Sequence, residues 1–189
     1  MRCSFSQCVS ALVLLVVAEL GFSAVLPVEN TDLRRIVVEE DGAGGRGEVV
    51  TFFNVPAEQV WSIISDFAQY PERIPEVKEF NIYSTDVNSV SAQLKISSFG
   101  LNYRYHLTHF VSPNKDVISW QLDPNKANDF AQLDGQWTLI PLEDGKTKVI
   151  YSVVIAMKSW MPQFILEKIA KSSLNSALDW VAVTLENPS

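Results

Sequence analysis

Cysteine is nearly absent from this chain of 189 residues. Its two cysteines, Cys3 and Cys8, both lie close to the N-terminus. If that segment is removed as a leader, the mature protein has neither a disulfide nor a thiol nucleophile. Histidine is as scarce, because His106 and His109 are the only two, and their spacing on a predicted strand places them on opposite faces. A zinc site would need further ligands, so the sequence predicts no bound metal and no cofactor.

Positive charge is also in short supply. The chain has 15 lysines and arginines against 22 aspartates and glutamates, a net charge of −7 and a pI near 4.8. This balance argues against a nucleic-acid-binding surface and against electrostatic docking on anionic lipid headgroups. Transient membrane contact through a local patch stays open, and the sequence does not specify the oligomeric state.

Motifs for nucleophilic catalysis and for phosphate binding are missing as well. The chain contains no G-x-S-x-G elbow, and no serine is visibly paired with a histidine and an acid. The glycine-rich segment DGAGGRG at 41–47 lacks the Lys-Ser/Thr pair of a phosphate-binding loop and does not open a helix. It is therefore predicted to be a flexible loop or a hairpin turn.

The N-terminal segment has the pattern of a secretory signal. The apolar run VSALVLLVVA at 9–18 follows the positive Arg2, and Gly21 and Ser23 are small residues at positions −3 and −1 of a cut after Ser23. We therefore expect residues 1–24 to be a signal peptide that directs export to a periplasmic or extracellular location. The alternative is an uncleaved anchor, although the run is short for a membrane span.

The rest of the chain has the length of one domain. Residues 25–46 are predicted to be a linker with a candidate first strand at 33–40, and residues 47–187 to form the domain. The hydrophobic content of 47% is enough for a substantial core.

The stretch at 54–77, NVPAEQVWSIISDFAQYPERIPEV, organises the predicted domain. Pro56 suits the first position of a helix, where its missing N–H costs nothing. Apolar residues then recur at helical spacing from Val60 to Phe67, which gives one broad apolar face. Pro71 is expected to stop this helix from continuing as a single rod.

Strands surround this stretch at short intervals. They are predicted at 48–55, 77–85, 89–98, 101–112, 116–122, 130–141 and 146–158. The separators are short and turn-like, which favours an antiparallel meander over parallel strands with long crossovers. Alternation places one set of residues on the inner face, including Tyr103, Tyr105, His109, Trp120, Gly135, Trp137 and Tyr151. The opposite face carries Arg104, Asp134, Gln136 and Lys148.

A second helix is predicted at the C-terminal end. Pro162 suits its first turn, and the apolar pattern continues to about Leu185. Ala170, Ser173 and Ala177 form a stripe of small residues at spacings of three and four. Two explanations stay open for this stripe, namely close packing against the sheet and room for a ligand beneath the helix.

These elements resemble a known family. The resemblance is carried by an apolar strand followed by Pro56, Val60-Trp61, Asp66-Phe67, Tyr70-Pro71 and Pro75-Glu76-Val77. The pattern is similar to the START-like (SRPBCC) superfamily, and more narrowly to its polyketide cyclase/dehydrase and lipid-transport group, which includes coenzyme Q-binding proteins. It covers roughly Gly47 to the end of the chain. It implies an α+β helix-grip fold, in which a curved antiparallel sheet wraps around a long C-terminal helix and leaves an apolar cavity.

Ten residues are the candidate ligand-binding site. They are Ile64, Phe67, Tyr70, Tyr103, Tyr105, Trp120, Trp137, Tyr151, Phe164 and Ala177. Ordinary core packing explains most of the aromatic residues, and the resemblance adds that such positions border an apolar pocket. The tyrosine hydroxyls would orient a quinone, sterol or polyketide-like ring.

Three functional classes remain open. The first is an exported binding protein or carrier for an apolar small molecule such as a lipid, quinone or polyketide-like compound. The second is a polyketide cyclase/dehydratase-like enzyme that uses the same cavity, with Asp66 or His109 as a candidate base but no catalytic residue assigned. The third is an interaction module without a ligand.

The leader hypothesis leads to a first prediction. Protein expressed in its native host should begin near Ser23 or Ala24, because the small residues there favour cleavage after the apolar run. N-terminal sequencing measures this directly. An intact Met1 on membrane-bound protein would show that the segment is an anchor.

Overall fold

The computed structural model describes residues 39–41, 44–98, 100–158 and 163–187, and it describes side chains from residue 44 onward except at 163–173 and 175. The predicted signal peptide and most of the predicted linker lie outside the described residues.

One antiparallel sheet forms the body of the protein. Its eight strands have the order β1-β2-β8-β7-β6-β5-β4-β3. Their bounds are β1 (Glu39–Asp41), β2 (Gly44–Phe53), β3 (Val77–Asp86), β4 (Ser89–Ser98), β5 (Leu101–Val111), β6 (Val117–Leu122), β7 (Phe130–Pro141) and β8 (Thr147–Met157). The strands from β3 to β8 are sequential neighbours, as the short separators predicted, and β2 pairs with β8 at the other end of the meander.

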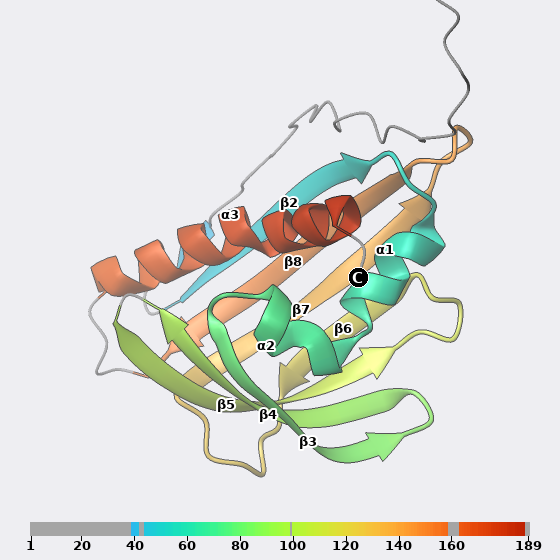
Figure 1. Ribbon diagram of the computed structural model, residues 1–189. Helices are drawn as coiled ribbons and strands as arrows, with labels where there is room; N and C mark the ends of the chain where they lie inside the picture. Colours follow the sequence, from blue (N-terminus) through green and yellow to red (C-terminus); the bar gives the residue numbers. More distant parts are fainter. Residues whose placement is uncertain (1–38, 42–43, 99, 159–162, 188–189) are drawn as a thin grey trace, which may run out of the picture.

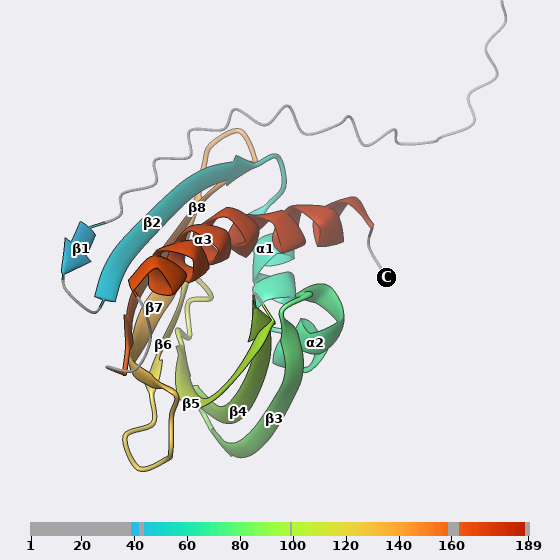
Figure 2. The same ribbon diagram turned by 90° about the vertical axis from the view of Figure 1, so that its left-hand side faces the viewer.

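The sheet curves around its helices. Figure 2 shows the long helix α3 (Gln163–Glu186) crossing the concave side of the sheet. The short helices α1 (Ala57–Ile64) and α2 (Tyr70–Arg73) lie on the same side, where α1 contacts β7 and α2 contacts β3. Figure 1 shows α3 running along β2 and β8, and α3 contacts both strands as well as α1. The expected α+β helix-grip architecture is therefore confirmed. No helix in the described part of the chain combines the length and the apolar character that a membrane span needs.

A close approach between α3 and β2 corrects one expectation. Residues 44–47 were expected in a loop, but they form the start of β2. A Cβ atom on Gly47 would lie 2.2 Å from Cδ1 of the buried Leu174 on α3. The absence of a side chain at position 47 therefore allows α3 to pack closely against β2. Glycine is unfavourable in a strand by propensity, and here the packing of a helix outweighs that preference.

The helix that begins after Pro56 also ends earlier than expected. α1 stops at Ile64, and a 3₁₀ turn, η1 (Phe67–Gln69), leads into α2, where Pro71 lies in the first turn. At the end of α1 both the backbone N–H and the hydroxyl of Ser65 donate to the Trp61 carbonyl, at 2.9 and 2.7 Å, and such a side-chain bond often bends a helix. The chain therefore bends before Pro71, and this bend turns Tyr70 toward the interior.

Candidate functional site

A pocket of about 190 Å³ lies between the inner face of the sheet and the helices α2 and α3. Strands β3 to β8 contribute its floor, which is largely aliphatic: Leu94, Leu107, Ile118, Leu133, Val153 and Ile155. Ser176, Ala177 and Trp180 of α3 cover it from the other side. Glu76, in the connection between α2 and β3, is the one charged residue among the described lining residues, and it is partly exposed.

A missing side chain shapes the floor of the pocket. Trp120 on β6 lies opposite Gly135 on β7, and a Cβ atom on Gly135 would come within 2.3 Å of Cζ2 of the Trp120 indole. The indole therefore lies over Gly135 and reaches the ring of Tyr151 on β8, with ring centroids 5.6 Å apart. Any larger residue at position 135 would push the indole off this strand.

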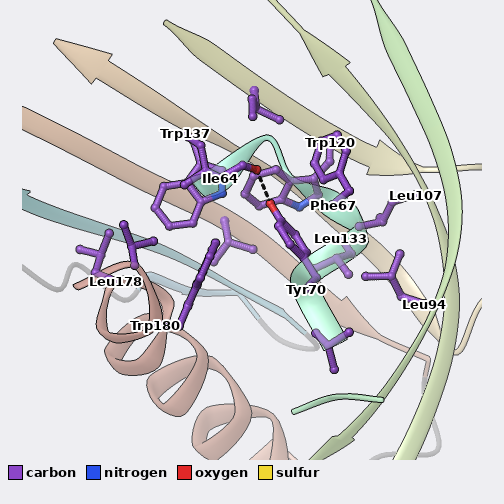
Figure 3. Close-up of a cluster of buried hydrophobic side chains, with 14 of the residues drawn as sticks. Ile64, Phe67, Tyr70, Leu94, Leu107, Trp120, Leu133, Trp137, Leu178 and Trp180 are labelled. Carbon is purple, nitrogen blue, oxygen red and sulfur yellow. Dashed lines mark hydrogen bonds between the residues drawn. The ribbon is translucent and has the colours of Figure 1, made fainter. Parts of the chain in front are cut away.

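Aromatic rings link the sheet to the helices at one side of the pocket. The ring of Trp137 lies 4.6 Å from that of Tyr151 and 6.3 Å from that of Trp180 on α3. Trp180 in turn meets the ring of Tyr70 on α2 at 5.4 Å. Figure 3 shows Trp137, Trp180 and Tyr70 pointing toward one another from three different elements. This group of rings forms a wall that apolar ring-shaped molecules can contact.

Tyr70 is held in place by the stretch around it. Its hydroxyl donates to the carbonyl of Ile64 at 2.6 Å, the dashed line in Figure 3. Arg73 braces the same bend, because its guanidinium lies 3.2 Å from a carboxylate oxygen of Asp66 and donates to the Ile63 carbonyl at 3.3 Å. Asp66 is thus engaged in a local ion pair and does not line the pocket.

His109 is a deeply buried polar group of the pocket. Its side chain is 4% exposed and lines the pocket from β5, with its ring centroid 4.7 Å from that of Phe67 and 5.7 Å from that of Phe80. Its Nδ1 atom has no hydrogen-bond partner. Burial lowers the pKa of His109 to about 4, and an interaction with the Val90 backbone opposes this shift only in part. The imidazole is therefore neutral at neutral pH.

Three buried tyrosines bring phenol groups to the same pocket. Burial raises the pKa of Tyr70, Tyr105 and Tyr151, and the Tyr151 phenol lies close enough to raise the pKa of the other two further. Tyr151 is enclosed by protein and yet keeps part of its surface accessible, because that surface faces the pocket. The phenols are therefore neutral hydrogen-bonding groups and not acids near neutral pH.

Metal binding has no support in this part of the protein. Among the residues that the structure describes, no three His, Cys, Asp or Glu side chains come together. His106 lies on the other face of β5 from His109, where its ring contacts Nε2 of Gln93 at 3.1 Å and the Ala127 carbonyl at 3.0 Å. Its role there is to hold neighbouring segments together.

Comparison with known families identifies the chain's relatives. The model of the polyketide cyclase / dehydrase and lipid transport family matches residues 53–180. The chain belongs to this family. Among curated proteins, it is similar to the ribosome association toxin RatA of Vibrio cholerae, with 23% identity over 124 residues that cover 66% of this chain and 81% of that protein.

Solved structures of the family's fold agree with this assignment. The Zhui aromatase/cyclase of Streptomyces sp. R1128 matches with a TM-score of 0.67 and 14% identity, covering 76% of this chain and 94% of that one. A STAR-related lipid transfer protein of Xanthomonas axonopodis matches with a TM-score of 0.60 and 14% identity over 80% of this chain and 99% of that one. Human STARD10 matches with a TM-score of 0.61 and 13% identity over 81% and 74% of the two chains. At these identities the likeness concerns the fold alone.

The structure brings together six of the ten candidate residues of this family member. Those that line the pocket are Tyr70, Tyr105, Trp120, Trp137, Tyr151 and Ala177. Ile64, Phe67 and Tyr103 are buried but belong to the solid core beside it. The side chain of Phe164 lies outside the described residues, as do those of Ala170 and Ser173 in the small-residue stripe.

Sequence reasoning left out several residues that line the pocket. Trp180 is the largest, and its spacing of three from Ala177 on a helix was the signal that could have found it. Phe130 is the first residue of β7 and follows a turn. No alternating pattern of apolar and polar residues precedes it that would have assigned its side chain to the inner face. His109 was considered as a base, whereas its isolation among aromatic rings became visible only in the structure.

The buried imidazole leads to a prediction about pH. Because the folded-state pKa of His109 lies near 4 and that of the unfolded chain near 6.5, the unfolded state binds a proton first as the pH falls. Stability is therefore lost between these two values. Relative to His109→Phe, the wild type should lose about 2–3 kcal/mol of unfolding free energy between about pH 7 and about pH 4.5.

Chemical denaturation at the two pH values measures this difference. His106→Phe is the matched control, because it makes the same substitution on the other face of the same strand and should keep the pH dependence of the wild type. Equal pH dependence in the wild type and in His109→Phe would contradict the buried, neutral state of His109.

Proposed function

We propose that this member of the polyketide cyclase / dehydrase and lipid transport family is an exported carrier of a small apolar molecule. The observation that carries the proposal is the pocket of about 190 Å³, which is lined mainly by aliphatic and aromatic side chains. Ligand sites are typically concave, mostly apolar and supplied with a few polar groups, and this pocket has that character.

The lining of the pocket favours an apolar occupant over water. Most of the lining side chains are apolar, and removing apolar surface from water contributes about 25 cal/mol per Å². An apolar ligand that binds only the folded chain also stabilises it by mass action.

The titratable groups favour a carrier over a cyclase/dehydratase-like enzyme. General acid–base catalysis works best with groups whose pKa lies near the working pH. In this pocket burial moves the pKa of His109 down to about 4 and the pKa of the tyrosines up. The other candidate base, Asp66, is paired with Arg73 away from the pocket. The polar lining is thus suited to orienting a ligand.

Two further features bear on where the carrier works. The signal-like segment at 1–24 supports export to a periplasmic or extracellular location. The name of the Vibrio relative mentions ribosome association, but a net charge of −7 opposes binding to an RNA surface. An interaction module without a ligand would need no void of this kind.

Ala177 supplies the test of the carrier hypothesis. This residue is 8% exposed and lines the pocket from α3. In Ala177→Phe the phenyl ring should enter the pocket, so the variant should fold with a cost below the roughly 1–3 kcal/mol that overpacking a solid core causes. Its affinity for a fluorescent apolar probe should fall sharply, because the ring occupies the volume of the ligand.

Denaturation and probe titration measure the two effects. Gln136→Thr, an exposed change on the outer face of β7, is the control and should bind the probe like the wild type. Unfolding of Ala177→Phe would show that Ala177 is close-packed with no pocket beside it. A folded variant that binds the probe normally would place the binding site elsewhere.

A further inference from the structure

Two tyrosines on the same face of β5 differ in the accessibility of their hydroxyl groups. The rings of Tyr103 and Tyr105 both contact Phe130, with centroids 5.6 and 5.1 Å away. The Tyr103 hydroxyl has no hydrogen-bond partner and no accessible surface, and the residue does not line the pocket. The Tyr105 hydroxyl has no partner in the described part of the chain either, but it keeps accessible surface. Because Tyr105 is only 6% exposed and lines the pocket, that surface faces the pocket.

Tyr151 on β8 brings a second unpartnered hydroxyl group to the pocket. The residue lines the pocket and is partly accessible, and the described residues offer its hydroxyl no hydrogen-bond partner. The Tyr151 phenol also lies near enough to Tyr105 to raise the pKa of that residue. Two phenols from different strands therefore lie close together in the pocket without satisfying each other.

The other polar side chains that line this part of the pocket leave few acceptors for a ligand to meet. The Tyr70 hydroxyl already donates to a backbone carbonyl, and the Nδ1 atom of His109 has no accessible surface. The indole rings of Trp120 and Trp137 carry N–H donors and no acceptor. Glu76 is the one carboxylate among the described lining residues, and it is partly exposed. A ligand that reaches the two phenols therefore meets mainly donors.

We propose that Tyr105 and Tyr151 are specificity-determining residues that select apolar ligands with a neutral carbonyl oxygen, to which both hydroxyl groups donate hydrogen bonds. A carbonyl oxygen fits because it has two lone pairs and can accept from both phenols. A carboxylate fits poorly, because moving a charged group out of water costs far more than moving a neutral one. The inference rests on the proposed function, since it requires a ligand in this pocket.

Two probes of nearly the same shape test this preference. 2-Acetylnaphthalene carries a carbonyl oxygen where 2-isopropenylnaphthalene carries a methylene group, and displacement of a fluorescent apolar probe measures the affinity of the full-length protein for each. Tyr105→Phe and Tyr151→Phe should each weaken 2-acetylnaphthalene relative to 2-isopropenylnaphthalene by about fivefold, because each variant removes one hydrogen bond of ordinary strength.

Tyr103→Phe is the matched control. It makes the same substitution two residues from Tyr105 on the same strand, but the hydroxyl group that it removes does not reach the pocket. The ratio of the two affinities should therefore equal that of the wild type. An equal change of the ratio in Tyr103→Phe would show that the loss of any nearby hydroxyl group has this effect, which would refute the proposal.

The remaining outcomes separate this inference from the proposed function. If the wild type binds neither probe, the carrier hypothesis fails and the inference fails with it. If the wild type binds both probes but Tyr105→Phe or Tyr151→Phe keeps its ratio of affinities, the pocket stands and recognition by the two phenols is refuted.

Infrared spectroscopy of the wild type keeps the test decisive if a variant does not fold. The carbonyl stretching frequency of bound, ¹³C-labelled 2-acetylnaphthalene should lie below its value in hexane, because accepting hydrogen bonds weakens the C=O bond. A stretching frequency equal to the value in hexane at saturation would overturn the proposal while leaving the carrier hypothesis intact.

Discussion

The pocket depends on one close approach between an indole ring and a bare backbone. Trp120 lies over Gly135 where a Cβ atom would be 2.3 Å away, and Ser152 on β8 brings a backbone oxygen within 2.5 Å of the same point. Because interiors are close-packed, a ring that tilts to one side leaves room on the other. Here the Trp120 indole contacts Tyr151 and so extends the group of aromatic rings. The neighbouring part of the pocket floor is lined by aliphatic side chains and His109.

The helices determine how that room is enclosed. α3 packs close to β2 because Gly47 has no side chain where Leu174 lies. The bend around Tyr70 places α2 over the opposite part of the sheet. The concave side is thus covered from two directions by elements that meet different strands, and a void remains between them. Apart from Glu76, the described groups that line it are neutral, which suits retention of an uncharged molecule better than proton transfer.

Alternation along the strands was enough to predict the inner face, and with it the pocket positions of Tyr105, Trp120, Trp137 and Tyr151. It could not separate residues that face a void from residues that face solid core, such as Tyr103, because both point inward with the same period. That distinction depends on the orientation of individual rings and on the distance between α3 and the sheet. Gly135 affects the orientation of Trp120, and Gly47 affects the packing distance of α3. The segment that contains Gly47 was predicted to be a loop from its composition.

The central claim is that the protein carries a small apolar molecule in this pocket. Native mass spectrometry of protein purified from its own compartment tests it most directly, because a bound molecule adds a discrete mass to the intact folded chain. We predict such an adduct, released into organic solvent when the protein is denatured. The mass of the bare polypeptide in the folded protein, with no apolar molecule in the extract, would contradict the account.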